Sequence, residues 1–270
     1  MTIIENKVEG KESPATCEDG IAVSDDFIAV VDGSTSKTPH HISPNMSNGR
    51  YAMQLIKKCV VTMPPNLSCH EFCDLVTQCI RNTCESAGTS IAQLRQHPEE
   101  RLTASAAVFS RVRQEVWLVG DCQCLIDTRY AGNPKPSEAI AASERARVVE
   151  EAIRQGSTLA DIEQHDPGRA HILPLLLQGM KGQNLSYAVI DGFPVYEAGV
   201  RIISTAGASQ VVLASDGYPF LCPTLEESER RLRQQLASDP LCIRTFKATK
   251  GLRCGNASFD DRAYIRFRND

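Results

Sequence analysis

The sequence is poor in several features that would point to particular classes of protein. Aromatic residues make up only 6% of the chain, so stacking platforms for single-stranded nucleic acid are not expected. The formal net charge is −4, whereas a nucleic-acid-binding surface needs a basic excess. No apolar run is long enough to cross a membrane, and residues 1–20 are too mixed and charged for a signal peptide. We therefore expect a soluble, cytoplasmic protein that binds neither nucleic acid nor membrane.

The cysteine spacing that is typical of zinc and redox motifs is also missing, although the chain has 11 cysteines. No Cys-x-x-Cys pair occurs, and without a secretion signal free thiols are expected rather than a disulfide framework. The densest group runs from Cys69 to Cys84 and includes His70, but its spacing departs from the usual zinc frames. Cys79 also falls on an apolar helical stripe. A structural zinc site is therefore the minority interpretation.

Apolar patterning predicts strands, a pair of helices, more strands, and then helices and strands again. Pro64-Pro65 ends the first helix, and Ser68-Cys69-His70-Glu71 predicts a capping box that begins the second. Residues 159–179 are mixed and broken at His165-Asp166-Pro167-Gly168, so no element is assigned there. The predicted helices are 46–60, 68–87, 137–155 and 224–237; the predicted strands lie within 20–31, around a turn at 24–26, and at 104–110, 115–120, 123–129, 187–190, 200–204, 211–214 and 262–267.

This order of elements predicts an α+β fold with layered, largely antiparallel sheets. No internal repeat, low-complexity tract or long linker interrupts the chain. We therefore expect residues 1–270 to form a single domain.

Acidic residues stand where several of the apolar runs begin or end. Asp19 precedes Ile21-Ala22-Val23, Asp32 follows the run that ends at Val31, and Asp216 follows Ala214-Ser215. Carboxylates at strand ends can meet at one edge of a sheet, where an oxygen-only cluster suits magnesium or manganese. The same residues would also serve in ordinary turns. The pattern thus predicts a metal site at a sheet edge, with strand-end turns as the alternative.

The order of these motifs resembles that of the metal-dependent protein phosphatases, the type 2C serine/threonine family. The matching elements are Glu18-Asp19, the strand ending in Asp32-Gly33, the pair of strands ending in Val119-Gly120-Asp121, Leu213-Ala214-Ser215-Asp216-Gly217, and Asp260-Asp261. The resemblance implies a four-layer α-β-β-α sandwich with two central, mostly antiparallel sheets. It also implies a phosphoric monoester hydrolase that acts on phosphoserine and phosphothreonine in a phosphoprotein partner.

The resemblance further implies the cofactors and the residues that hold them. Two Mn²⁺ or Mg²⁺ ions would activate a water that attacks phosphorus directly, so none of the cysteines has to be a nucleophile. Asp32 would bridge both ions, and Asp32 and Asp216 are the central catalytic residues. The further ligands implied are the Gly33 carbonyl, Asp260 beside Asp216 on one ion, Glu18 and Asp19 directly or through water, and Asp121 for a third, weaker ion. The choice between Asp260 and Asp261 stays open.

The sequence departs from the family on the side that would meet the substrate. Pro14 stands where the family usually has a phosphate-binding arginine, four residues before Glu18. The candidate replacements are Lys11, Lys37 and Arg50, of which Lys37 and Arg50 are our predicted phosphate-binding residues.

The acid for the leaving group is also missing from its usual place. Ser34-Thr35 follows Asp32-Gly33 in place of His-Gly, and His40 or His41 is the candidate replacement. Because both substrate-side positions differ, an alternative function remains open. The chain would then be a non-catalytic or specialised relative that binds a phosphorylated partner or hydrolyses a small phosphoester.

Overall fold

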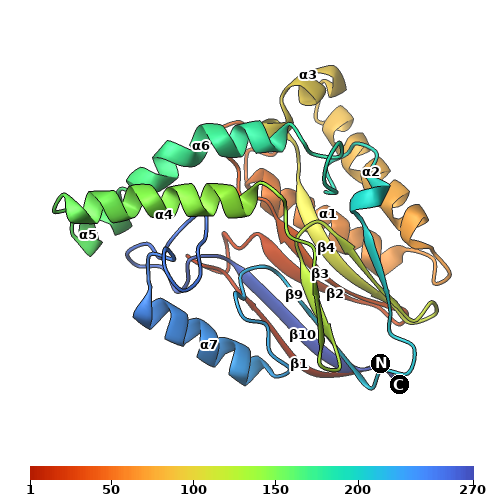
Figure 1. Ribbon diagram of the computed structural model, residues 1–270. Helices are drawn as coiled ribbons and strands as arrows, with labels where there is room; N and C mark the ends of the chain where they lie inside the picture. The colour runs from red at the N-terminus through yellow and green to blue at the C-terminus, as the bar shows by residue number, and fades with distance from the viewer.

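The computed structural model describes residues 1–270 and forms four layers (Figure 1). One five-stranded sheet has the order β1-β10-β9-β6-β7 and the other β2-β3-β4-β5-β8, and every strand pair in both is antiparallel. Helices α1 and α2 cover one outer face, and α7 covers the other. The strands are β1 (Thr2–Glu9), β2 (Asp19–Val23), β3 (Phe27–Gly33), β4 (Ala104–Ser110), β5 (Glu115–Val119), β6 (Gln123–Ile126), β7 (Arg129–Gly132), β8 (Arg201–Ser204), β9 (Gln210–Ala214) and β10 (Arg262–Arg268).

The helices divide into those that cover the sheets and those that cross the sheet edge. Helices α4, α5 and α6 lie between β7 and β8 in the chain, and α4 and α6 run side by side across one end of the sandwich (Figure 1). The α-helices are α1 (Asn48–Thr62), α2 (Cys69–Ser86), α3 (Ile91–Gln96), α4 (Glu138–Arg154), α5 (Leu159–Gln164), α6 (Pro167–Met180) and α7 (Leu225–Ser238), with short 3₁₀ helices at Pro98–Glu100 and Glu197–Gly199.

The alternation of side chains along the strands explains why both faces of each sheet are covered. Phe27, Ala29 and Val31 of β3 join the core beneath α1 and α2, whereas Ile28 and Val30 join the core between the sheets. In β9 the residues likewise alternate between the core that separates the sheets and the core on the side of α7. The predicted α-β-β-α sandwich with antiparallel sheets is therefore confirmed.

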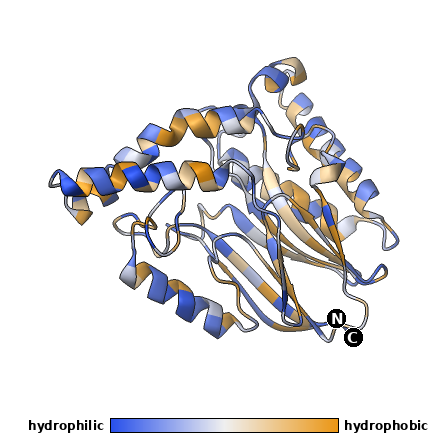
Figure 2. Cartoon of the chain, in the orientation of Figure 1, coloured by the Kyte–Doolittle hydropathy of each residue, from blue (hydrophilic) through white to orange (hydrophobic).

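Helix α7, which covers a sheet, and helix α6, which crosses the sheet edge, differ in polarity. In Figure 2, α7 is largely hydrophilic, whereas α6 carries a greater share of hydrophobic residues. Few of the hydrophobic residues of α6 are buried, and Leu175 is 46% exposed. No helix of the chain has the length and apolarity that a membrane crossing requires.

Several predicted elements need correction. Residues 187–190 do not form a strand of either sheet, since they make only two isolated bridges, from Ile190 to Ala104 and from Tyr187 to Gln183. The predicted strand 123–129 is a hairpin of β6 and β7, because Asp127 turns the chain with a φ of 52°. Strand β1 was not predicted, because its charged residues hide the apolar alternation expected of a strand.

The segment 159–179 contains helices, where no element was predicted. The breaker at 165–168 separates α5 from α6 and does not abolish either. Asp166 is the N-cap of α6 and accepts a hydrogen bond from the Arg169 backbone, while Pro167 occupies the first turn, where a missing N–H costs nothing. The same residues that end one helix thus begin the next.

Candidate metal centre

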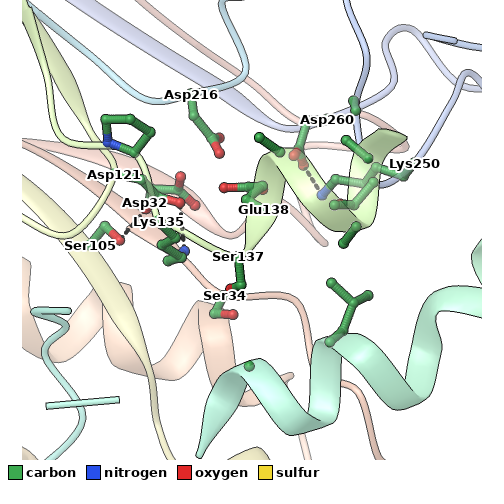
Figure 3. Close-up of a pocket in the computed structure, with 18 of the residues that line it drawn as sticks. Asp32, Ser34, Ser105, Asp121, Lys135, Ser137, Glu138, Asp216, Lys250 and Asp260 are labelled. Carbon is green, nitrogen blue, oxygen red and sulfur yellow. Dashed lines mark hydrogen bonds and ion pairs between the residues drawn. The ribbon is translucent and has the colours of Figure 1, made fainter. Parts of the chain in front are cut away.

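Three carboxylates from separate strand ends converge at the sheet edge beneath α4 (Figure 3). Asp32 ends β3, Asp121 follows β5, and Asp216 follows β9. One oxygen of each lies within 4.8 Å of the others. Three carboxylates offer only oxygen ligands, which is the donor set that hard divalent cations prefer. The residues present therefore fit magnesium or manganese.

The pKa values of two of these carboxyls reflect the crowding. Burial raises the pKa of Asp32 well above its ordinary value, and the negative charges of Asp19, Asp216 and Asp121 add to the effect. Burial followed by the charges of Asp121 and Asp260 raises the pKa of Asp216 in the same way. Negative charge is therefore concentrated at a point where nothing in the protein fully neutralises it, and a divalent cation would do so.

Asp19 is the cross-strand neighbour of Asp32, because the two residues pair in the antiparallel register of β2 and β3. Its Oδ2 atom is buried and has no hydrogen-bond partner. Burial raises the pKa of Asp19 to about 8, against a hydrogen bond from Ser215 that lowers it. An unpartnered buried carboxylate oxygen beside Asp32 is a second sign of a bound cation or an ordered water.

Asp121 differs from its neighbours because it already has a cationic partner. Its Oδ2 lies 2.5 Å from the ammonium of Lys135, and its Oδ1 accepts a hydrogen bond of 2.5 Å from Ser105. Burial acts to raise the pKa of Asp121, but the charge and hydrogen bond of Lys135 outweigh it and leave the pKa below its ordinary value. Glu138 lies beside this pair at the start of α4, with its carboxylate directed toward the cluster (Figure 3). Sequence reasoning identified neither Lys135 nor Glu138.

Asp260 and Asp261 have different roles. Asp260 lines the cavity described below, where it accepts a 2.5 Å contact from the Lys250 ammonium and a longer one of 3.5 Å from Lys11. Asp261 instead accepts hydrogen bonds from the backbone N–H groups of Lys11 and Glu18 at 2.7 and 3.1 Å. Asp260 therefore keeps the candidate ligand role, and Asp261 fixes the chain that precedes β2.

Glu18 and Gly33 lie close to the cluster but are held by the protein itself. Glu18 accepts hydrogen bonds of 2.6 Å from the hydroxyls of Thr35 and Ser47, so its carboxylate is satisfied without an ion. Gly33 packs so tightly that an added Cβ would lie 2.2 Å from the Gly49 carbonyl oxygen. Only glycine fits there, and this close packing fixes the backbone directly after Asp32.

A cavity of about 540 Å³ opens above the cluster. The strand ends that carry Asp32, Asp121 and Asp216 line one side of it, and α4, α6 and the segment 246–250 line the others. Tyr130, Tyr187 and the apolar side chains of α6 contribute non-polar surface, among them Leu175, Leu176 and Met180. The cavity therefore combines an anionic floor, cationic side chains and an apolar wall.

The candidate phosphate-binding residues separate clearly. Lys37 lines the cavity, whereas Arg50 does not and donates instead to the backbone carbonyls of Pro14 and Cys17. The Lys11 ammonium is surrounded by carboxylates, with Asp261 nearest at 3.1 Å. His40 and His41 are exposed outside the cavity lining. The cationic residues of the cavity that sequence reasoning missed are Lys135, Arg169, Lys247 and Lys250, and no motif marks them.

No family model matches the sequence, and no curated protein matches it. Solved structures do. They include the serine/threonine phosphatase PstP/Ppp of Mycobacterium tuberculosis, with 16% identity, a TM-score of 0.43 and 98% of both chains covered. The PstP catalytic domain in complex with two manganese ions has 14% identity and a TM-score of 0.45, with 100% of this chain and 99% of that chain covered.

PppA, a regulatory component of the type VI secretion system in Pseudomonas aeruginosa, is similar at 13% identity and a TM-score of 0.46, with 98% and 96% of the two chains covered. The chain is thus similar to bacterial phosphatase structures along nearly its whole length. At these identities and TM-scores, the assignment of function depends on the residues of the site itself.

Proposed function

We propose that the chain is a metal-dependent phosphatase, a phosphoric monoester hydrolase similar to the type 2C family, with all 270 residues in one phosphatase domain. Its substrates would be phosphoserine and phosphothreonine in proteins, and its cofactors Mn²⁺ or Mg²⁺. The observation that carries the proposal is the convergence of Asp32, Asp121 and Asp216 at the floor of a cavity that lysine and arginine side chains also line. A cytoplasmic location is part of the same proposal.

The site residues divide the work between them. Bound divalent cations would neutralise the charge of the phosphate and supply a water of lowered pKa. Asp32 and Asp216 would hold these cations, with the Gly33 carbonyl and Asp260 beside them. Asp19 and Glu18 would contribute directly or through water, and Asp121 would hold a further ion in exchange for Lys135.

The surrounding residues would prepare the site for an anionic substrate. Lys135 and Lys250 each neutralise one carboxylate, so the net negative charge that a phosphate meets is reduced. Helices α4 and α6 line the cavity and so restrict its access to water, which strengthens electrostatic contacts within it. Lys37 stands free to meet the phosphate.

A small phosphoester is the second candidate substrate. The observation that favours it is the position of α4 and α6 across the cavity, which leaves less room for a folded protein than an open cleft would. The choice between the two candidates is a choice of substrate for the same cluster of carboxylates.

Hydrolysis of p-nitrophenyl phosphate and of a phosphopeptide, each with and without Mn²⁺, tests the proposal. We expect Mn²⁺-dependent turnover that Asp32→Asn and Asp216→Asn abolish. The matched control is Asp25→Asn, which removes an exposed carboxylate outside the cavity. Turnover of p-nitrophenyl phosphate alone favours the small phosphoester. No turnover of either substrate by the metal-loaded chain would sink the phosphatase proposal and favour a binding role.

A further inference from the structure

Five cationic side chains line the cavity, and three of them have no carboxylate partner. Lys135 pairs with Asp121 and Lys250 pairs with Asp260. Lys37, Arg169 and Lys247 line the same cavity and form no ion pair with any carboxylate, and Lys247 is exposed. Lys37 and Arg169 are therefore the two part-buried cations of the cavity that have no carboxylate ion-pair partner.

Lys37 and Arg169 come from different parts of the fold. Lys37 belongs to the loop that follows β3, and its ammonium donates to the carbonyl of Thr35. Arg169 lies in the first turn of α6 and donates from Nη1 to the Thr249 carbonyl at 3.0 Å. Each side chain keeps further N–H donors that no protein acceptor uses, because a lysine has three and an arginine five.

The position of Arg169 is fixed by the beginning of α6. Asp166 accepts the Arg169 backbone N–H at 2.8 Å through Oδ1 and the Arg145 side chain at 2.7 Å through Oδ2. Arg145 is only 1% exposed and donates further to the Leu241 carbonyl. Arg169 is thus presented by a buried network, which would keep its guanidinium toward the cavity.

The positive charges of Lys37 and Arg169 lie close enough to affect each other's surroundings, and this favours binding of an anion between them. Burial lowers the pKa of Lys37 to about 7, and the positive charge of Arg169 is the next cause, ahead of Lys250 and Lys135. Burial likewise lowers the pKa of Arg169. The charges of Asp260 and Asp166 act in the opposite direction on Arg169, but neither carboxylate forms an ion pair with it. Two part-buried cations that line one cavity without an ion-pair partner are a common feature of functional sites.

We propose that Lys37 and Arg169 together bind the phosphoryl oxygens of the substrate, in the role of the arginine that Pro14 replaces. The inference rests on the proposed function, and it adds that helix α6 supplies half of the phosphate site. The other candidates are less suited, because carboxylates surround Lys11 and backbone carbonyls occupy Arg50. Lys247 lines the cavity as well, but it is exposed to solvent. The guanidinium of Arg169 can bind two phosphate oxygens at once, and Lys37 adds a point charge.

Binding of inorganic phosphate to the Mn²⁺-loaded full chain, measured by calorimetry, tests the pair without requiring turnover. We expect Lys37→Met and Arg169→Gln each to weaken phosphate binding by about tenfold or more, the loss expected of a charge-assisted hydrogen bond. Arg169→Lys should restore part of the affinity. The matched controls are Lys58→Met on α1 and Arg154→Gln at the far end of α4, both exposed and outside the cavity.

The outcomes separate the pair from the proposed function. If the wild type binds Mn²⁺ and phosphate but hydrolyses no phosphoester, the phosphatase proposal is rejected. The phosphate affinities of the Lys37 and Arg169 variants then still decide whether the pair binds phosphate. If the double variant folds, binds Mn²⁺ and holds phosphate within about twofold of wild type, the pair is overturned. A double variant that hydrolyses p-nitrophenyl phosphate with an unchanged KM overturns it as well, and leaves the phosphatase proposal intact. A wild type that binds Mn²⁺ but no phosphate also rejects the pair.

Discussion

The ammonium of Lys135 lies 2.5 Å from Oδ2 of Asp121, and this contact joins the segment that leads into α4 to the carboxylate cluster. Lys135 precedes α4 by only a few residues, so its ion pair with Asp121 fixes the start of the helix that lines the cavity. A cation bound at Asp121 would compete with Lys135 for the same oxygen. Metal binding and the position of the cover are therefore linked by electrostatics.

Lys135→Met should destabilise the metal-free chain by on the order of 2 kcal/mol, because it leaves the buried Asp121 without its partner. The same change should increase the stabilisation that Mn²⁺ provides, since no ammonium competes for Asp121. Thermal unfolding with and without Mn²⁺ measures both effects. Lys135→Arg is the matched control, as it keeps the charge, and an equal Mn²⁺ shift in all three chains would contradict the competition.

Asp216→Asn should raise the melting temperature of the metal-free chain and abolish the rise caused by Mn²⁺. The first effect follows because the pKa of Asp216 is raised in the folded chain, so folding costs free energy either to protonate this carboxyl or to keep it ionised among its acidic neighbours. An amide carries no such cost, and relief of ~1 kcal/mol corresponds to about 2–4 °C in a chain of this size. The second follows because a metal ligand is lost. Calorimetric scans check both effects against Asp25→Asn. A destabilised metal-free variant that still responds fully to Mn²⁺ would speak against a ligand role.

Stability of the metal-free chain should fall as the pH rises from about 5 to about 7. The pKa of Asp19 is raised to about 8, and those of Asp32 and Asp216 are also raised, so the folded chain holds more protons than the unfolded chain in this range. The free energy of unfolding must then decrease with pH. Urea unfolding in the presence of a chelator measures it, and a rise in stability over this range would refute the assigned crowding.

Excess Mn²⁺ should reverse that trend. Metal binding requires ionised carboxylates and therefore releases protons, so the stabilisation by Mn²⁺ should grow over the same pH range. The same urea titrations, repeated with Mn²⁺, measure this difference. A stabilisation that does not depend on pH would place the ion away from Asp19, Asp32 and Asp216.

Glu229→Gln should cost about 3 kcal/mol of stability without altering metal binding. Glu229 on α7 accepts hydrogen bonds from Arg262 of β10 at 2.8 Å and from the Tyr218 hydroxyl at 2.7 Å. Its substitution removes one of the two carboxylates that pair with the buried Arg262, and leaves Glu9 at 2.6 Å as the other. Chemical unfolding against Glu226→Gln, an exposed change on the same helix, tests this, and a difference below about 0.5 kcal/mol would contradict it.

The fold and the anionic half of the site are largely predictable from the sequence. Asp32 and Asp216 follow short, continuous apolar runs of the kind that indicates a buried strand, and strand ends in stacked sheets meet at one edge. The assignment of β6 and β7 fails because a single left-handed residue, Asp127, makes the turn without a Gly or Pro to mark it. The local sequence pattern is thus sufficient to predict the position of a site residue that directly follows a recognisable strand.

The cationic half of the site is not predictable in this way. Arg169 and Lys250 reach the cavity only because α6 and the segment before β10 fold back over the sheet edge. Such an approach depends on tertiary contacts between residues far apart in sequence, as when Arg145 donates to the Leu241 carbonyl. No spacing within either segment carries that information.

The place of β10 in its sheet has a consequence for how the chain folds during synthesis. It pairs with β1 on one side and β9 on the other, although it follows all the other strands of the two sheets in chain order. All strands of the sheet formed by β2, β3, β4, β5 and β8 precede β10 in the chain. That sheet can therefore assemble before β10 is synthesised, while β1 and β9 still have unpaired edges. Asp260 directly precedes that last strand. A ribosome-bound chain that lacks β10 would therefore have one finished sheet, two open edges and an incomplete metal site.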